Sequence, residues 1–212
     1  RKGTWIPQQT LLVLQATENI LPSQWVRVHV LPSQGFQLPL DGIEKNDANI
    51  KISTNAAEGP VLPTSMHRVQ PVGSFLGKTR LAFGQALVGL PTSIFVRFRA
   101  SVAMFEDEIV SLQLPGFGGP YGLNMVYNSN SGLVHASWSG PEMSTLVLTL
   151  KYTYVANEDF EVEVSPTSSW PGISLPSVGT FLNQADFTLS STAIAGPILP
   201  TPFAYTEPVT GF

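Results

Sequence analysis

Apolar and polar residues alternate along most of the chain with the two-residue period of a β-strand. Near the N-terminus the alternation covers residues 12–14 and 26–30, where Arg27 and His29 separate three valines. Leu-Pro-Ser stretches bound the second of these segments, so we expect two strands joined by a turn. No stretch has a convincing apolar period of 3.6 residues. The pattern therefore predicts an all-β protein.

The same alternation predicts a strand at 48–54 and a series of short strands after residue 75. The later strands are expected at residues 80–85, 94–99, 110–114, 123–127, 133–138, 146–150 and 160–164. The sequence Asn-Ser-Asn-Ser-Gly at 128–132 predicts a hairpin tip between two of them. Short strands punctuated by turns are typical of an antiparallel β-sandwich of immunoglobulin-like type.

Part of the sequence occurs twice. The segment Gly-Pro-Val-Leu-Pro-Thr at 59–64 corresponds to Gly-Pro-Ile-Leu-Pro-Thr at 196–201, an offset of 137 residues. Between residues 46 and 75, which align with 183–212, 12 of the 30 positions are identical, including Phe75 and Phe212. Further upstream, the apolar positions of 146–164 align with those of 12–30 at an offset of 134. Self-similarity at a fixed spacing indicates repeated structural units.

The repeat divides the chain unevenly. Residues 75–212 are expected to form one complete immunoglobulin-like β-sandwich unit, and residues 1–74 correspond only to the C-terminal half of such a unit. Half a sandwich exposes an apolar face and unpaired sheet edges, which favour association. The side chains expected on this assembly interface are Leu12, Leu14, Val26, Val28, Val30, Ile50 and Ile52.

Three arrangements would cover that interface. The missing strands could come from a neighbouring chain, as in donor-strand assembly. They could lie upstream in a longer polypeptide, which fits a chain that opens on Arg1-Lys2 without an initiator methionine or signal peptide. Residues 1–74 could instead pack onto the complete unit. The first two arrangements are favoured, and both imply a polymeric or multi-unit object.

The prolines of the repeated segment restrict its place in a sheet. Proline lacks the N–H that a ladder needs, so the segment is expected at a sheet edge or in an extended linker. We expect it to carry the chain out of one unit toward the next. The predicted junction residues are Gly59, Pro60, Pro63, Gly196, Pro197 and Pro200.

Composition narrows the function classes. Charged residues make up 12% of the 212 residues, the formal net charge is −4, and cysteine is absent. The charge gives no electrostatic reason to expect nucleic-acid binding, and without cysteine there is no disulfide framework or thiolate chemistry. The sequence contains no run of 18 apolar residues, so no membrane-spanning helix is predicted. A weakly charged chain rich in Ser, Thr and Pro is typical of extracellular and cell-surface proteins.

Candidate chemistry is sparse. Hard cations bind clustered carboxylates, so Glu106, Asp107 and Glu108 are weak candidates for Ca²⁺ ligands, although a solvated turn is favoured because adjacent carboxylates alternate faces. The three histidines are far apart, and no nucleophile elbow or cofactor fingerprint occurs, so neither an enzyme nor a bound cofactor is expected. Six aromatic residues would form a sugar-stacking platform if exposed together, although a role as core or interface anchors is favoured: Trp5, Trp25, Trp138, Trp170, Tyr121 and Tyr127.

Four short sequence segments occur in an order that is shared with a known type of repeat. They are Val-Gly-Ser-Phe (72–75), Val-Ser-Leu-Gln-Leu-Pro-Gly-Phe-Gly-Gly (110–119), Ala-Ser-Trp (136–138) and Thr-Leu-Val-Leu-Thr-Leu (145–150). This order resembles the repeat domain of giant extracellular surface proteins of algae and protists. The resemblance implies an extracellular structural or adhesive array without catalytic residues.

The sequence thus predicts a structural building block of an extracellular filament or surface array. Its expected partners are copies of itself or adjacent repeats of a longer polypeptide, joined by strand complementation. The alternative is a glycan- or partner-binding adhesion module of a cell-surface protein. A viral jelly-roll capsid protein is disfavoured, because one jelly roll would not repeat half a unit.

Overall fold

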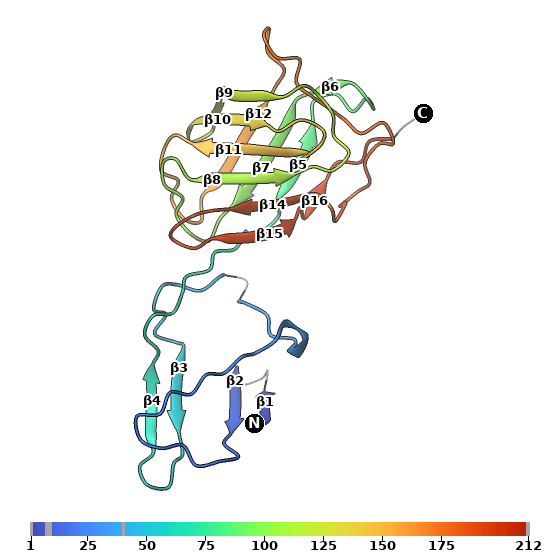
Figure 1. Cartoon of the computed structure of the whole chain (residues 1–212). Coiled ribbons are helices and arrows are strands. Elements are labelled where there is room, and N and C mark those ends of the chain that lie inside the picture. Colours follow the sequence, from blue (N-terminus) through green and yellow to red (C-terminus); the bar gives the residue numbers. More distant parts are fainter. Residues whose placement is uncertain (1, 7–9, 40, 211–212) are drawn as a thin grey trace. The chain divides into compact units, whose positions relative to one another are not determined.

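The computed structural model describes residues 2–6, 10–39 and 41–210 (Figure 1). These residues form strands, turns and loops, and the helical segment among them is a 3₁₀ turn, η2 (Pro32–Gln34). A helix able to cross a membrane does not occur in the described part of the chain. The all-β class predicted from the alternation is confirmed.

The strands follow one another along the whole chain. They are β1 (Lys2–Ile6), β2 (Leu11–Gln15), β3 (Lys51–Thr54), β4 (Val61–Ser65), β5 (Arg80–Phe83), β6 (Pro91–Thr92), β7 (Ile94–Arg99), β8 (Ile109–Gln113), β9 (Gly122–Ser129), β10 (Gly132–Trp138), β11 (Thr145–Leu150), β12 (Asp159–Val164), β13 (Ile173–Ser174), β14 (Thr188–Ser191), β15 (Ile198–Pro202) and β16 (Tyr205–Thr206).

The chain forms two compact units, Arg1–Gln37 and Leu38–Phe212. In the first unit, β1 and β2 pair as an antiparallel hairpin in which Trp5 lies opposite Leu12. The Trp5 ring packs on the ring of Phe36, with centroids 4.5 Å apart. The division into a half repeat and a complete repeat after residue 74 stays a prediction.

The second unit contains a ten-stranded sheet in the order β15-β14-β8-β11-β10-β9-β12-β7-β5-β16. Its strands pair antiparallel except β16 and β5, which run parallel. Only Phe203 and Ala204 separate the edge strands β15 and β16 in the chain, and two residues bridge about 10 Å at most. A flat sheet of ten strands would place its edges about 40 Å apart. The sheet therefore curls until its two ends approach each other (Figure 1).

The curled sheet encloses the apolar core. In β8, Val110 and Leu112 are fully buried, and the polar residues between the core positions face outward, as the period of two requires. On the opposite arc of the sheet, Phe98 of β7 stacks on Phe160 of β12 with ring centroids 4.5 Å apart. The strands predicted after residue 75 are confirmed, with ends displaced by one to a few residues. The expected hairpin tip at 128–132 joins β9 to β10.

The strand predicted at residues 26–30 is wrong, because these residues form no strand. Their repeat equivalents, residues 160–164, lie in β12, which has β7 on one side and β9 on the other. A strand exists through the hydrogen bonds of its neighbours. Residues 26–30 keep the alternation of β12 but have no neighbouring strand among the described residues.

The strand pair that carries the repeated segment, and the turns before it, have the same local structure in both copies of the repeat. Strands β3 and β4 coincide with β14 and β15 at the offset of 137, and both pairs show the same register with an irregularity at the same place. The turn glycines Gly42 and Gly179 have φ angles of 79° and 80°. Asn46 and Asn183 have φ angles of 58° and 56°. The aligned Phe212 lies outside the described residues.

The hydrogen bonds around these strands repeat as well. The bridge between Ile43 and Val72 recurs between Thr180 and Val209. In each copy the glycine that opens the Gly-Pro segment donates its N–H to the alanine carbonyl three residues earlier, at 3.2 Å in the first copy and 3.1 Å in the second. Because these backbone hydrogen bonds are the same although the two sequences differ, both copies adopt the same fold in this part of the repeat.

The structural repeat extends further upstream than the aligned sequence. In the β1–β2 hairpin Trp5 pairs with Leu12, and in the β10–β11 hairpin Trp138 pairs with Leu146. Six residues separate the paired Trp and Leu in the first hairpin and seven in the second, a difference of one residue. This shift moves β1 out of the offset of 134 and hides the match from a simple sequence alignment.

Candidate functional site

The strongest candidates for functional residues are apolar side chains of the first copy. We use the name first-copy face for the seven predicted assembly residues: Leu12, Leu14, Val26, Val28, Val30, Ile50 and Ile52. Leu12 and Ile50 are partly buried, and the other members are exposed. The first five members belong to the unit Arg1–Gln37 and the last two to the unit Leu38–Phe212.

Equivalent positions differ in burial between the two copies. Ile52 is 57% exposed and its equivalent Leu189 is 0% exposed. Val28 is 43% exposed, whereas its equivalent Val162 is 1% exposed. Leu62 provides the contrast, because it and its equivalent both lie exposed on the outward side of their strands. The burial difference seen at Ile52 and Val28 therefore does not extend to this outward position.

The strands of the first copy also lack neighbours. In the second copy, β11 pairs with β10 and β8, and β14 pairs with β15 and β8. In the first copy, β2 pairs with β1 and β3 pairs with β4, and no further strand flanks β2 or β3 in the part of the chain that the structure describes. Each of these two-stranded sheets thus presents free edges to a potential partner.

The prolines of the repeated segments lie where a missing N–H does little harm. Pro63 is part of β4, and Pro200 is part of β15, which forms one edge of the ten-stranded sheet. Both strands pair on one side only. Pro60 and Pro197 precede the strands. The expectation that these segments avoid central strands is confirmed.

A close backbone contact surrounds Gly196. The N–H of Gly73, at the end of the first copy, donates to the carbonyl of Pro197 at 3.2 Å. A Cβ atom on Gly196 would lie 2.8 Å from the backbone nitrogen of Gly73. Around the equivalent Gly59, no atom of the described chain lies within 4 Å of the Cβ position. Gly196 thus contacts the chain that arrives from the preceding copy, and Gly59 has no such contact.

The acidic run distributes its carboxylates among different partners. Glu106 is exposed, and Asp107 forms an ion pair with Lys151 at 2.5 Å. Glu108 is buried and accepts hydrogen bonds from the N–H groups of Phe105 (2.8 Å) and Ile194 (2.7 Å). The run therefore fixes a turn against two loops. Among the described residues no group of three or more His, Asp or Glu side chains could hold a metal ion.

The six aromatic residues do not form one sugar-stacking platform, and two of the tryptophans have the core role that the sequence favoured. Trp138 and Trp170 are buried, and their indole N–H groups donate to the carbonyls of Gly119 (3.4 Å) and Pro120 (2.9 Å). Tyr127 packs against the core, and its hydroxyl donates to the carbonyl of Ser165. The tryptophans of the second copy are core residues whose polar atoms are satisfied.

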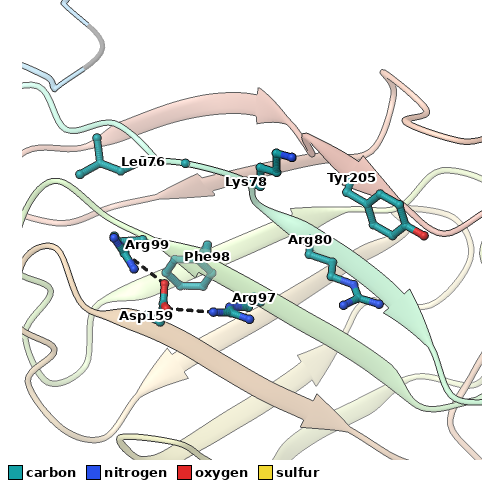
Figure 2. Close-up of a pocket in the computed structure, with 9 residues that line it drawn as sticks. Leu76, Lys78, Arg80, Arg97, Phe98, Arg99, Asp159 and Tyr205 are labelled. Atoms are coloured by element: carbon teal, nitrogen blue, oxygen red, sulfur yellow. Dashed lines mark hydrogen bonds and ion pairs between the residues drawn. The ribbon is translucent and has the colours of Figure 1, made fainter.

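Sequence reasoning missed a basic pocket on the outer face of the sheet. The pocket has a volume of about 540 Å³, and its charged lining consists of Lys78, Arg80, Arg97, Arg99 and Asp159. Figure 2 shows Asp159 between two of the arginines, with Arg97 at 2.9 Å and Arg99 at 3.1 Å. The guanidinium of Arg80 lies over the ring of Tyr205, 5.3 Å from its centroid.

The charges of this pocket are partly balanced. The hydrogen bond from Arg99, with a further one from Arg97, lowers the pKa of Asp159, and the same contact with Asp159 raises the pKa of Arg99. Beyond Arg80 and Arg97, an adjoining hollow is also lined by Glu161 and Glu207. The outer face therefore carries an excess of cations at one end. Cross-strand alternation of Arg and Asp could have suggested the ion pairs, because Asp159 lies opposite Arg99 in the register.

Comparison of the chain with models of known protein families, with curated proteins and with solved structures found no match.

Proposed function

We propose that the protein is a structural building block that assembles through repeated β-sandwich units of immunoglobulin-like type, in an extracellular filament or surface array. One observation carries the proposal. The repeat occurs twice with the same backbone pattern, and the side chains that form the core of the second copy are uncovered in the first. The extracellular location rests on the weakly charged, cysteine-free composition and the family resemblance.

The exposed apolar side chains of the first copy supply free energy for association when a partner covers them. Complete burial of a Val or Ile side chain is worth about 1.5–3 kcal/mol. Val26, Val28 and Val30 are each about 40% exposed and Ile52 is 57% exposed, so a partner gains much of this energy by covering them. The edges of β2 and β3 offer backbone hydrogen bonds to the same partner. Exposed apolar side chains and free strand edges both favour assembly over a lasting monomeric state.

Light scattering coupled to size-exclusion chromatography tests the proposal on residues 1–212. We expect a mass above that of one chain, rising with protein concentration. Ile52→Lys combined with Val28→Lys should shift the population toward the monomer, because two charges would be placed on the first-copy face. Leu62→Lys is the matched control and should change the mass little, since its repeat equivalent is exposed too. A stable, concentration-independent monomer of the unmodified chain would refute the proposal.

A second candidate function is an adhesion module that binds acidic glycans. The basic pocket favours it, because Lys78 and Arg80 add cationic charge beside the paired arginines. Binding to dextran sulfate, with neutral dextran as the control, distinguishes this candidate. Specific binding should weaken about tenfold on Lys78→Ala with Arg80→Ala and fall with salt. Equal retention of the unmodified and doubly substituted proteins would remove this candidate.

A further inference from the structure

In the second copy, the positions equivalent to the first-copy face are covered by other strands of the same repeat. Strand β8 lies between β11 and β14, pairing antiparallel with both. The repeat equivalents of β11 and β14 are β2 and β3. A strand of the β8 type is therefore the element that the first copy lacks between these two strands.

Within its described residues, the first copy also lacks strands of the β7 and β9 types, which would flank residues 25–30. Their equivalents form β12, which lies between β7 and β9 and is central in the ten-stranded sheet. Val162 and Val164 are buried there, while Val28 and Val30 in the first copy are exposed. Strands β7, β8 and β9 all belong to residues 75–131, the part of the repeat without a counterpart in residues 1–74.

The number of segments excludes simple strand exchange between copies of this chain. Each chain holds two C-terminal halves, residues 1–74 and 132–212, but a single segment of the type 75–131. That segment is already paired with residues 132–212. If it moved to the first copy of another chain, one half would still be uncovered for every chain present.

We infer that the first-copy face binds an additional polypeptide segment with the strand pattern of residues 75–131, supplied from outside this 212-residue chain. The inference rests on the proposed assembly function and names its partner. The segment presents apolar side chains at alternate positions of strands like β7 and β8, where Val96, Phe98, Val110 and Leu112 are buried in the second copy. It inserts beside β2 and β3 and converts residues 25–30 into a central strand.

The surroundings of Gly196 and Gly59 indicate the order in which successive repeats follow one another. In the second copy, the residues just before the 75–131 segment pack on Gly196, through the bond from the Gly73 N–H to the Pro197 carbonyl. The open space at Gly59 is the equivalent place in the first copy. The completing segment therefore brings a small residue at its start to Gly59, and successive repeats follow one another head to tail.

A completed chain tests the inference. A second copy of residues 75–134 is placed directly before Lys2, where β1 takes the role of β10. We expect amide hydrogen exchange within residues 26–30 and 51–54 to slow about 100-fold or more relative to the unmodified chain. The completed chain should also be monomeric. The control carries Asp at the grafted positions equivalent to Val110 and Leu112, and it should leave exchange in the first copy fast.

The outcomes separate the two proposals. If the unmodified chain associates but the grafted segment leaves exchange at 26–30 and 51–54 unchanged, the partner named here is wrong and the assembly function stands. If the unmodified chain is a monomer, the assembly function fails. Slow exchange at 26–30 in the unmodified chain at high concentration alone would identify a second copy as the partner and overturn the inference.

Discussion

Ile52 and Leu189 hold the same position in the repeat and differ in what covers them. Removing a buried leucine side chain costs the transfer energy and leaves a cavity, so Leu189→Ala should lower the unfolding free energy by about 2–5 kcal/mol. Ile52→Ala should cost less than about 1 kcal/mol, because its side chain is largely in solvent. Urea unfolding at low protein concentration measures both values. Equal losses would contradict the burial difference between the copies.

Tyr154 predicts a dependence of stability on alkaline pH. Burial raises the pKa of its hydroxyl, and the hydrogen bond with Ser129 opposes part of that shift. Below the ordinary tyrosine pKa of about 10 the folded and unfolded chains are both protonated. Above it the unfolded chain releases its proton first, so stability is lost as the pH rises through the folded-state pKa.

Tyr154→Phe should therefore reduce the loss of unfolding free energy between pH 9 and pH 11, measured by urea titration. Some loss should persist, since burial also raises the pKa of Tyr127. Tyr121→Phe is the matched control, because it removes the hydroxyl group from an exposed tyrosine. An identical profile for Tyr154→Phe would show that the buried hydroxyl does not govern alkaline stability.

Some residue environments were accessible from the sequence and others were not. Val134, Ala136 and Trp138 share one face of a strand by simple alternation, which agrees with the core role favoured for the aromatic residues over a sugar platform. The partners of Asp107 and Glu108 could not. Lys151 and Ile194 reach the turn from loops 44 and 86 residues away, through tertiary contacts that alternation does not describe.

At the scale of elements, the same alternating pattern gives a strand at 159–164 and none at 25–30. Period-two alternation shows which face of a strand would be apolar and which polar. Whether the strand forms depends on hydrogen bonds to neighbouring strands. The restriction imposed by proline is different, because it belongs to the residue. The edge location of Pro63 and Pro200 was therefore predictable without knowledge of the sheet order.

The contact between successive copies gives an element-level prediction. A Cβ atom at Gly196 would meet backbone atoms of Gly73 and Val72 at 2.8 and 3.1 Å, which cannot yield as a flexible side chain can. Gly196→Ala should lower the unfolding free energy by about 1–3 kcal/mol. Gly84→Ala, whose added Cβ would first meet a Ser93 side-chain atom at 3.1 Å, should cost less. Similar unfolding midpoints for both variants would contradict a tight junction.

At the scale of the molecule, the all-β class followed from the sequence, whereas strand number and strand order did not. Seven strands were expected after residue 75, and the structure describes twelve, β5 to β16. Neighbours such as β12 and β7 are some 60 residues apart in the chain, and their pairing depends on how the entire sheet closes. The repeat was detectable because its spacing is fixed. Its upstream end at β1 was hidden by a loop that differs by one residue.

Limited proteolysis tests the uneven stability of the chain. Trypsin at low concentration should first cut within residues 1–74, after residues such as Lys45 and Lys51, because this part has exposed backbone and few buried side chains. Arg97 and Arg99 lie in β7 between two paired strands and should resist cleavage. Mass spectrometry identifies the fragments. Early cleavage after Arg97 or Arg99 would contradict a stable sheet around β7.

The parallel pair of β5 and β16 has a mechanical consequence. Tyr205 and Thr206 lie beside Arg80 and Leu81, with hydrogen bonds from Tyr205 N–H to the Thr79 carbonyl and from Glu207 N–H to the Leu81 carbonyl, both 3.0 Å long. The predicted complete repeat begins just before β5 and ends just after β16. Tension along a string of such repeats would pull these two strands in opposite directions along their length. Their hydrogen bonds would then resist together in shear, instead of opening one at a time as a zipper does.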